Sequence, residues 1–276
     1  MAVAAAAAAA TFGLTGVASG ASLNYAALGD SYAAGVGAGG TAVDASDPNK
    51  CLRNTNAYPE LYAKANSATL DFQACSGATT ATVLKDQLGK LSSSTNLVSI
   101  TVGGNDVEFT DVVTQCVEGS LTGGTDADCK KAVDKGEDIA RNSLPGLLDN
   151  LYSQIKSKAP KAHVVVLGYP ALYALGNPSC PFAPSDTSRG YLNEGAGVLD
   201  GVIQAAAKKA GFTYADVRSS FVGHQVCSGS DWIHGVELPD ITPSFHPNAA
   251  GQQNGYLPNL QANAKIFYKS VRPSHS

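Results

Sequence analysis

The chain has 276 residues, of which 44% are hydrophobic and 15% are charged, and its formal net charge is −4 at pH 7. This length and apolar content suit one α/β domain with a sizeable core and exclude a wholly disordered chain. Lysine and arginine are scattered and form no basic stripe of the kind that binds nucleic acid, so no nucleic-acid partner is expected.

The N-terminal 21 residues combine an Ala-rich apolar run with small residues typical of a signal-peptide cleavage site, although the usual basic start is missing. We therefore expect residues 1–21 to be a signal-peptide remnant and residues 22–276 to form a single domain of a secreted, extracellular protein. No later stretch approaches the roughly 20 consecutive apolar residues of a membrane-spanning helix, so no integral membrane span is expected.

Segments that predict strands alternate with segments that predict helices. In chain order they are a strand at 22–29, a helix at 57–65, strands at 68–76 and 96–106, a helix at 130–157, a strand at 162–170, a helix at 190–210, a strand at 212–217 and a helix at 248–268. The strands are short apolar runs that end in turn residues, and the helices have apolar residues three or four apart, with an interruption near Pro258 in the last. This alternation predicts a three-layer α/β/α sandwich with a mostly parallel central sheet.

Three predicted strands end in polar turns, at residues 29–31, 75–77 and 103–106. Ligands of such sheets bind beyond the carboxyl ends of the strands. We therefore expect these three turns, which are far apart in the sequence, to converge on one site.

The six cysteines are spaced without any CxxC pair and do not suit a compact zinc site, so no metal is expected. An even number of cysteines behind an export signal favours three disulfides. Pairing neighbours in chain order closes the shortest loops, and on that ground we expect the disulfides Cys51–Cys75, Cys116–Cys129 and Cys180–Cys227.

The turn after the first strand, ALGDSYAAGVGAGG at 27–40, has three interpretations. No lysine follows its glycines, as a Walker phosphate loop requires, and GVGAGG begins six residues after Gly29, too late for a dinucleotide-binding fingerprint. Gly-Asp-Ser is also common as plain turn chemistry, because Asp and Ser both bond the local backbone. The turn is therefore either structural or a loop that exposes a reactive serine.

Four blocks occur in order at long intervals: GDSYAAG at 29–35, ACSGATT at 74–80, VGGNDV at 102–107 and SFHPNAAG at 244–251. Together they resemble the SGNH (GDSL) hydrolase family, and most closely its secreted actinobacterial lipases, esterases and phospholipases with three disulfides. The resemblance covers nearly the whole chain from Ser22 onward. It implies a flavodoxin-like sandwich and a monomeric serine hydrolase that cleaves small-molecule or lipid carboxylic esters without a cofactor.

By this resemblance Ser31 is the nucleophile and His246 is its general base, since a serine hydroxyl attacks well only when a base takes its proton. The same resemblance implies that the Ser31 amide, the Gly77 amide and the Asn105 side chain form the oxyanion hole. Taken alone, Gly77 would be an ordinary turn glycine and Asn105 a turn or helix-cap residue.

The sequence departs from the family pattern at the third catalytic position, where an Asp normally lies three residues before the histidine. That position holds Pro243, and Asp240 and Asp231 lie further upstream. A backbone carbonyl can also accept the Nδ1–H bond and fix the tautomer. We therefore expect a Ser-His dyad in which the carbonyl of Ser244, or of Pro243 as second choice, orients His246.

The other histidines are weaker candidates. His234 follows Asp231 by three residues and is the alternative base. His224, beside Cys227, either lines the substrate cleft or makes structural hydrogen bonds, whereas His163 and His275 are expected to be structural or mobile.

Aromatic and acidic neighbours complete the expected site. Tyr32, Phe245 and Trp232 either line an acyl-binding surface or pack in the core, and Asp30 is expected to brace the nucleophile turn.

Two classes of function remain open at this stage. The first is a secreted lipase or esterase that works through an acyl-enzyme, with a phospholipase A or an acetylated-polysaccharide esterase as variants. The second is a noncatalytic secreted binding module, because a fold alone does not establish chemistry.

Overall fold

The computed structural model describes residues 22–43, 46, 51–177 and 180–271, with side chains up to residue 264. The expected signal peptide at 1–21 and His275 lie outside the described residues.

A parallel sheet of five strands forms the centre of the structure, in the order β2-β1-β3-β4-β5. The strands are β1 (Asn24–Gly29), β2 (Thr69–Phe72), β3 (Leu97–Thr101), β4 (His163–Leu167) and β5 (Thr213–Ala215). The inner strands β1, β3 and β4 are almost entirely buried, as expected for continuous apolar runs covered on both faces. The α/β sandwich and the position of each predicted strand are confirmed, and every strand pair is parallel.

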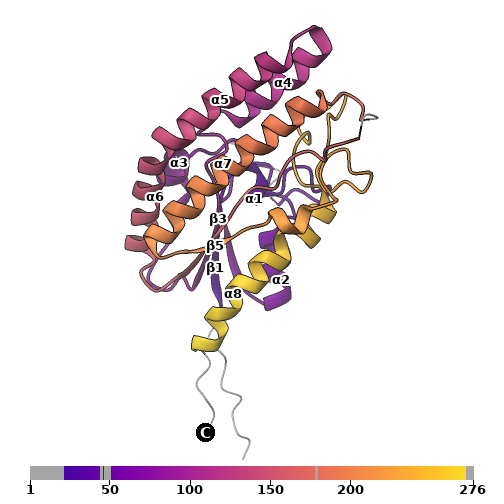
Figure 1. Ribbon diagram of the computed structural model, residues 1–276. Helices are drawn as coiled ribbons and strands as arrows, with labels where there is room; N and C mark the ends of the chain where they lie inside the picture. The colour runs from indigo at the N-terminus through magenta and orange to yellow at the C-terminus, as the bar shows by residue number, and fades with distance from the viewer. Residues whose placement is uncertain (1–21, 44–45, 47–50, 178–179, 272–276) are drawn as a thin grey trace, which may run out of the picture.

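Helices cover both faces of the sheet (Figure 1). One face carries α2 (Tyr58–Asn66) and α8 (Leu257–Val271), which pack on each other and on the strands. The other layer contains α4 (Phe109–Thr122), α5 (Asp126–Asn142), α6 (Leu144–Lys158) and α7 (Asp186–Ala210). Short elements complete the chain: α1 (Ser31–Ala34), α3 (Thr80–Thr82), π-helical turns at Val83–Gln87 and Gly251–Tyr256, and a 3-10 turn at Arg218–Phe221.

Residues 130–157 are helical as predicted, but the chain breaks at Ser143 and forms two helices, α5 and α6. Pro145 explains the break: its ring clashes with a preceding turn, but it fits the first turn of a new helix. The predicted interruption near Pro258 is present as a change of helix type: the π-helical turn Gly251–Tyr256 runs directly into α8, of which Pro258 is the second residue.

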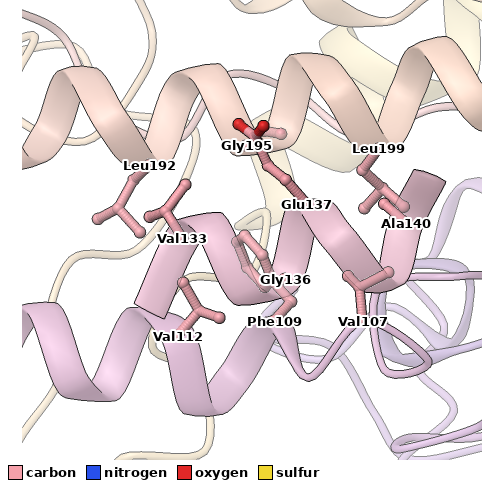
Figure 2. Close-up of a pocket in the computed structure, with 11 residues that line it drawn as sticks. Val107, Phe109, Val112, Val133, Gly136, Glu137, Ala140, Leu192, Gly195 and Leu199 are labelled. Atoms are coloured by element: carbon pink, nitrogen blue, oxygen red, sulfur yellow. The ribbon is translucent and has the colours of Figure 1, made fainter. Parts of the chain in front are cut away.

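Helix α4 was not predicted; it packs beside α5, which in turn packs against α7. Val112, Val133, Leu192 and Leu199, which come from these three helices, line a small apolar cavity (Figure 2). Its volume is about 20 Å³. The interior is therefore close to full, and this layer holds the N-terminal end of α4 in a fixed place above the sheet.

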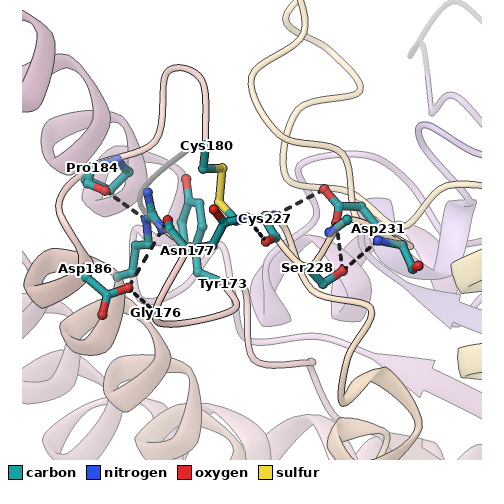
Figure 3. Close-up of a disulfide and its surroundings, with 12 residues drawn as sticks. Tyr173, Gly176, Asn177, Cys180, Pro184, Asp186, Cys227, Ser228 and Asp231 are labelled. Atoms are coloured by element: carbon teal, nitrogen blue, oxygen red, sulfur yellow. Dashed lines mark hydrogen bonds and ion pairs between the residues drawn. A yellow bond between two sulfur atoms is a disulfide. The ribbon is translucent and has the colours of Figure 1, made fainter.

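Three disulfides join the pairs expected from the shortest loops. Cys51–Cys75 fastens the turn after β2, and Cys116–Cys129 links α4 to α5. Cys180–Cys227 joins the segment before α7 to the segment after β5 (Figure 3). Each bond constrains loops at the sheet's carboxyl end or the helical layer beside it.

Among the described residues, no helix is long and apolar enough to span a membrane. The same residues contain no group of three or more His, Cys, Asp or Glu side chains arranged to hold a metal ion.

Candidate active site

The nucleophile turn begins where β1 ends. Gly29 has a φ of 122°, and a Cβ there would lie 2.2 Å from the carbonyl oxygen of Thr101, so only glycine fits against β3. Asp30 then caps α1, because its Oδ1 accepts the Tyr32 amide at 3.0 Å. Ser31 is the first residue of α1 and is therefore held at the carboxyl end of the sheet.

His246 lies against Ser31, and its Nε2 is 2.8 Å from Ser31 Oγ. Its other ring nitrogen, Nδ1, is 2.9 Å from the carbonyl oxygen of Ser244. A carbonyl only accepts, so Nδ1 carries the hydrogen and Nε2 of the neutral ring accepts from the serine hydroxyl. Burial lowers the pKa of His246 to about 4, so this neutral ring is the form present at pH 7.

A tight backbone turn lets the Ser244 carbonyl face the ring only two residues ahead. Phe245 adopts a left-handed conformation with a φ of 62° between them. Tyr32 donates from its hydroxyl to the Phe245 carbonyl at 2.6 Å and so ties this turn to α1. The position of the imidazole is thus set by backbone groups.

No described carboxylate is hydrogen-bonded to His246. Asp240 is exposed and accepts from the Thr242 amide at 3.0 Å. Asp231 accepts from Ser228 Oγ at 2.7 Å and from the Gly229 amide at 3.0 Å, which closes its own loop (Figure 3).

The three polar turns converge, because residues of all three line one cleft with His246. Asn105 Nδ2 donates to the Ala78 carbonyl at 3.0 Å, which orients the amide and leaves it a second N–H. Among the described residues, no protein group accepts a hydrogen bond from the Ser31 or Gly77 amide. The cleft therefore offers donors from three loops beside one hydroxyl.

The cleft has a volume of about 450 Å³ and continues from Ser31 toward the N-terminal end of α4. Apolar side chains line that end, namely Phe109 and Val113 of α4 and Ile241 and Phe245 of the segment before His246. A hydrocarbon chain would be removed from water there, at about 0.8 kcal/mol per buried methylene.

Tyr169 links two of the turns and was not anticipated from the sequence. Its hydroxyl donates a short hydrogen bond to Asp30 and accepts from the Gly104 amide at 3.0 Å. Burial raises the pKa of Asp30 to about 7 and that of Tyr169 well above its usual range. The one clue in the sequence is that Tyr169 also follows a strand, β4, at the same edge of the sheet.

The remaining candidates from the sequence lie outside the Ser31 cleft. His234 uses both ring nitrogens, with Nδ1 2.9 Å from Glu237 Oε1 and Nε2 2.9 Å from the Gly37 carbonyl oxygen. Trp232 stacks on His224 with ring centroids 3.7 Å apart. His163 Nε2 lies 3.1 Å from the Asn263 carbonyl oxygen, at the other end of the sheet.

Comparison with known proteins identifies the family of the chain. Residues 27–253 match the model of the GDSL-like lipase/acylhydrolase family. The chain belongs to this family. The family relatives include Lipase 1 of Streptomyces coelicolor, which is 48% identical over 241 residues, covering 87% of this chain and 86% of the relative. A lipase of Streptomyces rimosus is 45% identical over 240 residues, with the same coverage of both chains.

Two crystal structures are similar over most of this chain. A phospholipase A1 from Streptomyces albidoflavus matches with a TM-score of 0.81 and 45% identity, over 88% of this chain and 100% of that one. The extracellular lipase from Streptomyces rimosus matches with a TM-score of 0.80 and 43% identity, again over 88% and 100%.

Proposed function

We propose that the protein is a secreted serine hydrolase that cleaves carboxylic esters of lipids through an acyl-enzyme, with Ser31 as nucleophile and His246 as base. The observation that carries the proposal is a pair of hydrogen bonds that share the His246 ring. One joins Ser31 Oγ to His246 Nε2 at 2.8 Å, and the other joins His246 Nδ1 to the Ser244 carbonyl oxygen at 2.9 Å. Membership in the GDSL-like lipase/acylhydrolase family supports the reaction class.

In this mechanism Ser31 Oγ attacks the ester carbonyl carbon while its proton moves to His246 Nε2. The carbonyl oxygen becomes an oxyanion, which accepts hydrogen bonds from the Ser31 and Gly77 amides and from Asn105 Nδ2. His246 then gives its proton to the leaving alcohol. A water molecule, activated by the same imidazole, hydrolyses the acyl-serine and restores the hydroxyl.

The Ser244 carbonyl replaces the carboxylate of a triad. It holds the tautomer and orientation of His246 but brings no full negative charge. It therefore stabilises the imidazolium less than an Asp would, and the oxyanion donors carry more of the catalysis.

The proposed location is outside the cell, because three disulfides persist in an oxidising compartment. We also propose that the region from Ser22 onward acts as one domain, since one sheet supplies the turns that carry Ser31, Gly77 and Asn105.

The test is hydrolysis of p-nitrophenyl esters from acetate to palmitate by the native chain, Ser31→Ala and His246→Ala, with melting curves of each. Both variants should lose at least about 10³-fold in kcat while melting close to the native temperature. His234→Gln is the matched control, a histidine outside the cleft, and should keep kcat within about tenfold of native. Turnover retained by Ser31→Ala would remove that residue from the mechanism, and no turnover by the native chain would favour a binding module.

A further inference from the structure

Gln87 is a buried glutamine, only 3% exposed, at the end of the π-helical turn Val83–Gln87. Its Oε1 accepts the Gly29 amide at 2.8 Å, and its Nε2 donates to the Gly29 carbonyl at 2.8 Å. On this side of β1 the neighbouring strand β2 has already ended at Phe72, so no residue of β2 pairs with Gly29. The side-chain amide therefore takes the place of a strand and holds the backbone of Gly29 with a clamp of two hydrogen bonds.

Gln252 makes a similar clamp on the other side of Ser31. It is fully buried and lies in the second π-helical turn, Gly251–Tyr256. Its Oε1 accepts the Tyr58 amide at 2.9 Å, and its Nε2 donates to the Tyr32 carbonyl at 3.0 Å. Tyr58 begins α2, which has no side-chain cap, and Tyr32 belongs to the four-residue helix α1, so both backbone groups lie where helices leave such groups without partners.

The two glutamines hold the nucleophile from both sides. Gln87 binds Gly29, two residues before Ser31, and Gln252 binds Tyr32, the residue after it. Neither glutamine lines the cleft, so neither contacts a substrate bound at Ser31. Their hydrogen bonds act on the backbone that places the Ser31 amide and hydroxyl.

Each glutamine also connects the nucleophile turn to another part of the site. The turn that ends at Gln87 follows α3, which begins three residues after Gly77. Gln252 lies six residues after His246 in the same segment of chain. Gln87 therefore sets Ser31 relative to the proposed oxyanion donor Gly77, and Gln252 sets it relative to the proposed base.

We propose that Gln87 and Gln252 are positioning residues for ester hydrolysis, which align Ser31 with Gly77 and with His246 respectively. This inference rests on the proposed function, in which Ser31 is the nucleophile. A side-chain amide suits the task, because it donates and accepts at once and adds no charge near the imidazole. A displacement of about 1 Å at a reacting group can cost about 10²-fold in rate, so the two clamps act on kcat rather than on substrate binding.

The first experiment measures kcat and KM on p-nitrophenyl butyrate for the native chain, Gln87→Met and Gln252→Met, with a melting curve of each. Methionine is unbranched and close to glutamine in length, but it forms neither hydrogen bond of the clamp. The value of kcat should therefore fall about 10- to 100-fold while KM stays within about twofold. A native kcat in either folded variant would remove that residue from the proposal.

Asn193→Leu is the matched control. Asn193 also clamps the backbone of one residue, since its Oδ1 accepts the Tyr173 amide at 3.0 Å and its Nδ2 donates to the Tyr173 carbonyl at 2.8 Å. Neither of these residues lines the cleft. Losing this clamp should lower the melting temperature but leave kcat within about threefold of native. An equal loss of kcat in Asn193→Leu would show that the glutamines act only through stability, and would overturn the positioning role.

A second variant, Gln87→Glu, gives a readout that a merely structural role would not move. An ionised carboxylate accepts the Gly29 amide but cannot donate to the Gly29 carbonyl, whereas a protonated carboxyl group does both. Since burial favours the protonated form, the ratio of kcat in the variant to kcat in the native chain should be about tenfold higher at pH 5 than at pH 8. Dividing by the native value removes the titration of Asp30 and His246, which both proteins share. A constant ratio would contradict the role of Gln87.

The same assays separate this inference from the proposed function. If the native chain hydrolyses the ester and both glutamine variants match it, the positioning role is overturned and the hydrolase stands. If the native chain hydrolyses no ester, the proposed function is refuted, and the positioning role is refuted with it.

Discussion

His246 Nε2 lies 2.8 Å from Ser31 Oγ, although 215 residues of chain separate them. Two backbone carbonyls set this contact: that of Ser244 receives the Nδ1–H of the ring, and that of Phe245 receives the hydroxyl of Tyr32. The His246 ring is therefore oriented toward Ser31 without a hydrogen bond from the ring to a described carboxylate.

The first prediction concerns the acid that a triad would require. Asp240→Asn and Asp231→Asn should each lower kcat less than about tenfold, because the Ser244 carbonyl holds the imidazole. Asp240 gives the cleaner result, since Asp231 also closes the Ser228–Gly229 loop. A loss near the roughly 10⁴-fold seen when a triad acid is disabled would show that a carboxylate orients the base.

The second prediction concerns pH. Burial lowers the pKa of His246 to about 4, so the base is neutral above that pH and protonated below it. kcat/KM should therefore stay level down to about pH 5 and fall tenfold per unit below about pH 4. Asp30, whose pKa is raised to about 7 by burial, is the other titrating group beside the nucleophile, so the profile is repeated on Asp30→Asn. An inflection near pH 6.5 that persists in that variant would contradict the assignment.

The third prediction concerns Tyr169 as a positioning residue. Tyr169→Phe keeps the ring packed edge-on against Tyr32 but removes the hydroxyl that joins Gly104 to Asp30. The turn that carries Asn105 then loses an anchor, so kcat should fall about 10- to 100-fold with KM nearly unchanged.

Tyr152→Phe provides the control for this substitution. Tyr152 is fully buried, and its hydroxyl has no hydrogen-bond partner among the described residues, so kcat should not change. A rise in KM with kcat intact in Tyr169→Phe would assign Tyr169 to substrate binding instead.

The fourth prediction concerns stability against pH. Burial raises the pKa of Asp200 to about 7, above the value near 4 of an unfolded Asp, so the folded state holds this proton more tightly. Its contribution to the free energy of unfolding is therefore full below about pH 4 and is lost as the pH rises through 7. Denaturant titrations should show the native chain losing stability relative to Asp200→Asn between pH 5 and pH 8.

Asp126→Asn is the comparison for that measurement. Hydrogen bonds from the Ser185 and Ser188 hydroxyls lower the pKa of Asp126, so this group stays ionised over the same interval. Its difference from the native chain should be constant between pH 5 and pH 8. A constant difference for Asp200→Asn as well would contradict the burial argument.

Much of the fold was predictable because strand signals and strand ends are local. The buried runs of β1, β3 and β4 are continuous apolar segments, and the polar residues that follow β1 and β3 must meet at one edge of a parallel sheet. The pairing of Ser31 with His246 could be predicted only from the resemblance to a known family, because nothing near His246 in the sequence indicates where its loop folds.

Other features depend on tertiary packing and left weaker signals. Helix α4 mixes Thr, Asp and Gly with its apolar residues, and Glu108 before it adopts a left-handed conformation, so neither its period nor its start is typical. In the sequence Tyr169 looks like an ordinary core residue at the end of a strand. Its role could not be predicted, because its two hydrogen-bond partners, Asp30 and Gly104, lie far away in the sequence. The helical character of 130–157 was predictable, whereas its division into α5 and α6 depends on one residue, Pro145.

The most direct test of the account is covalent labelling of the native chain with an alkyl fluorophosphonate, followed by peptide mass mapping. We expect one adduct, on the peptide that contains Ser31, formed far more slowly in His246→Ala. An adduct on a different serine, or undiminished labelling of Ser31 without His246, would contradict it.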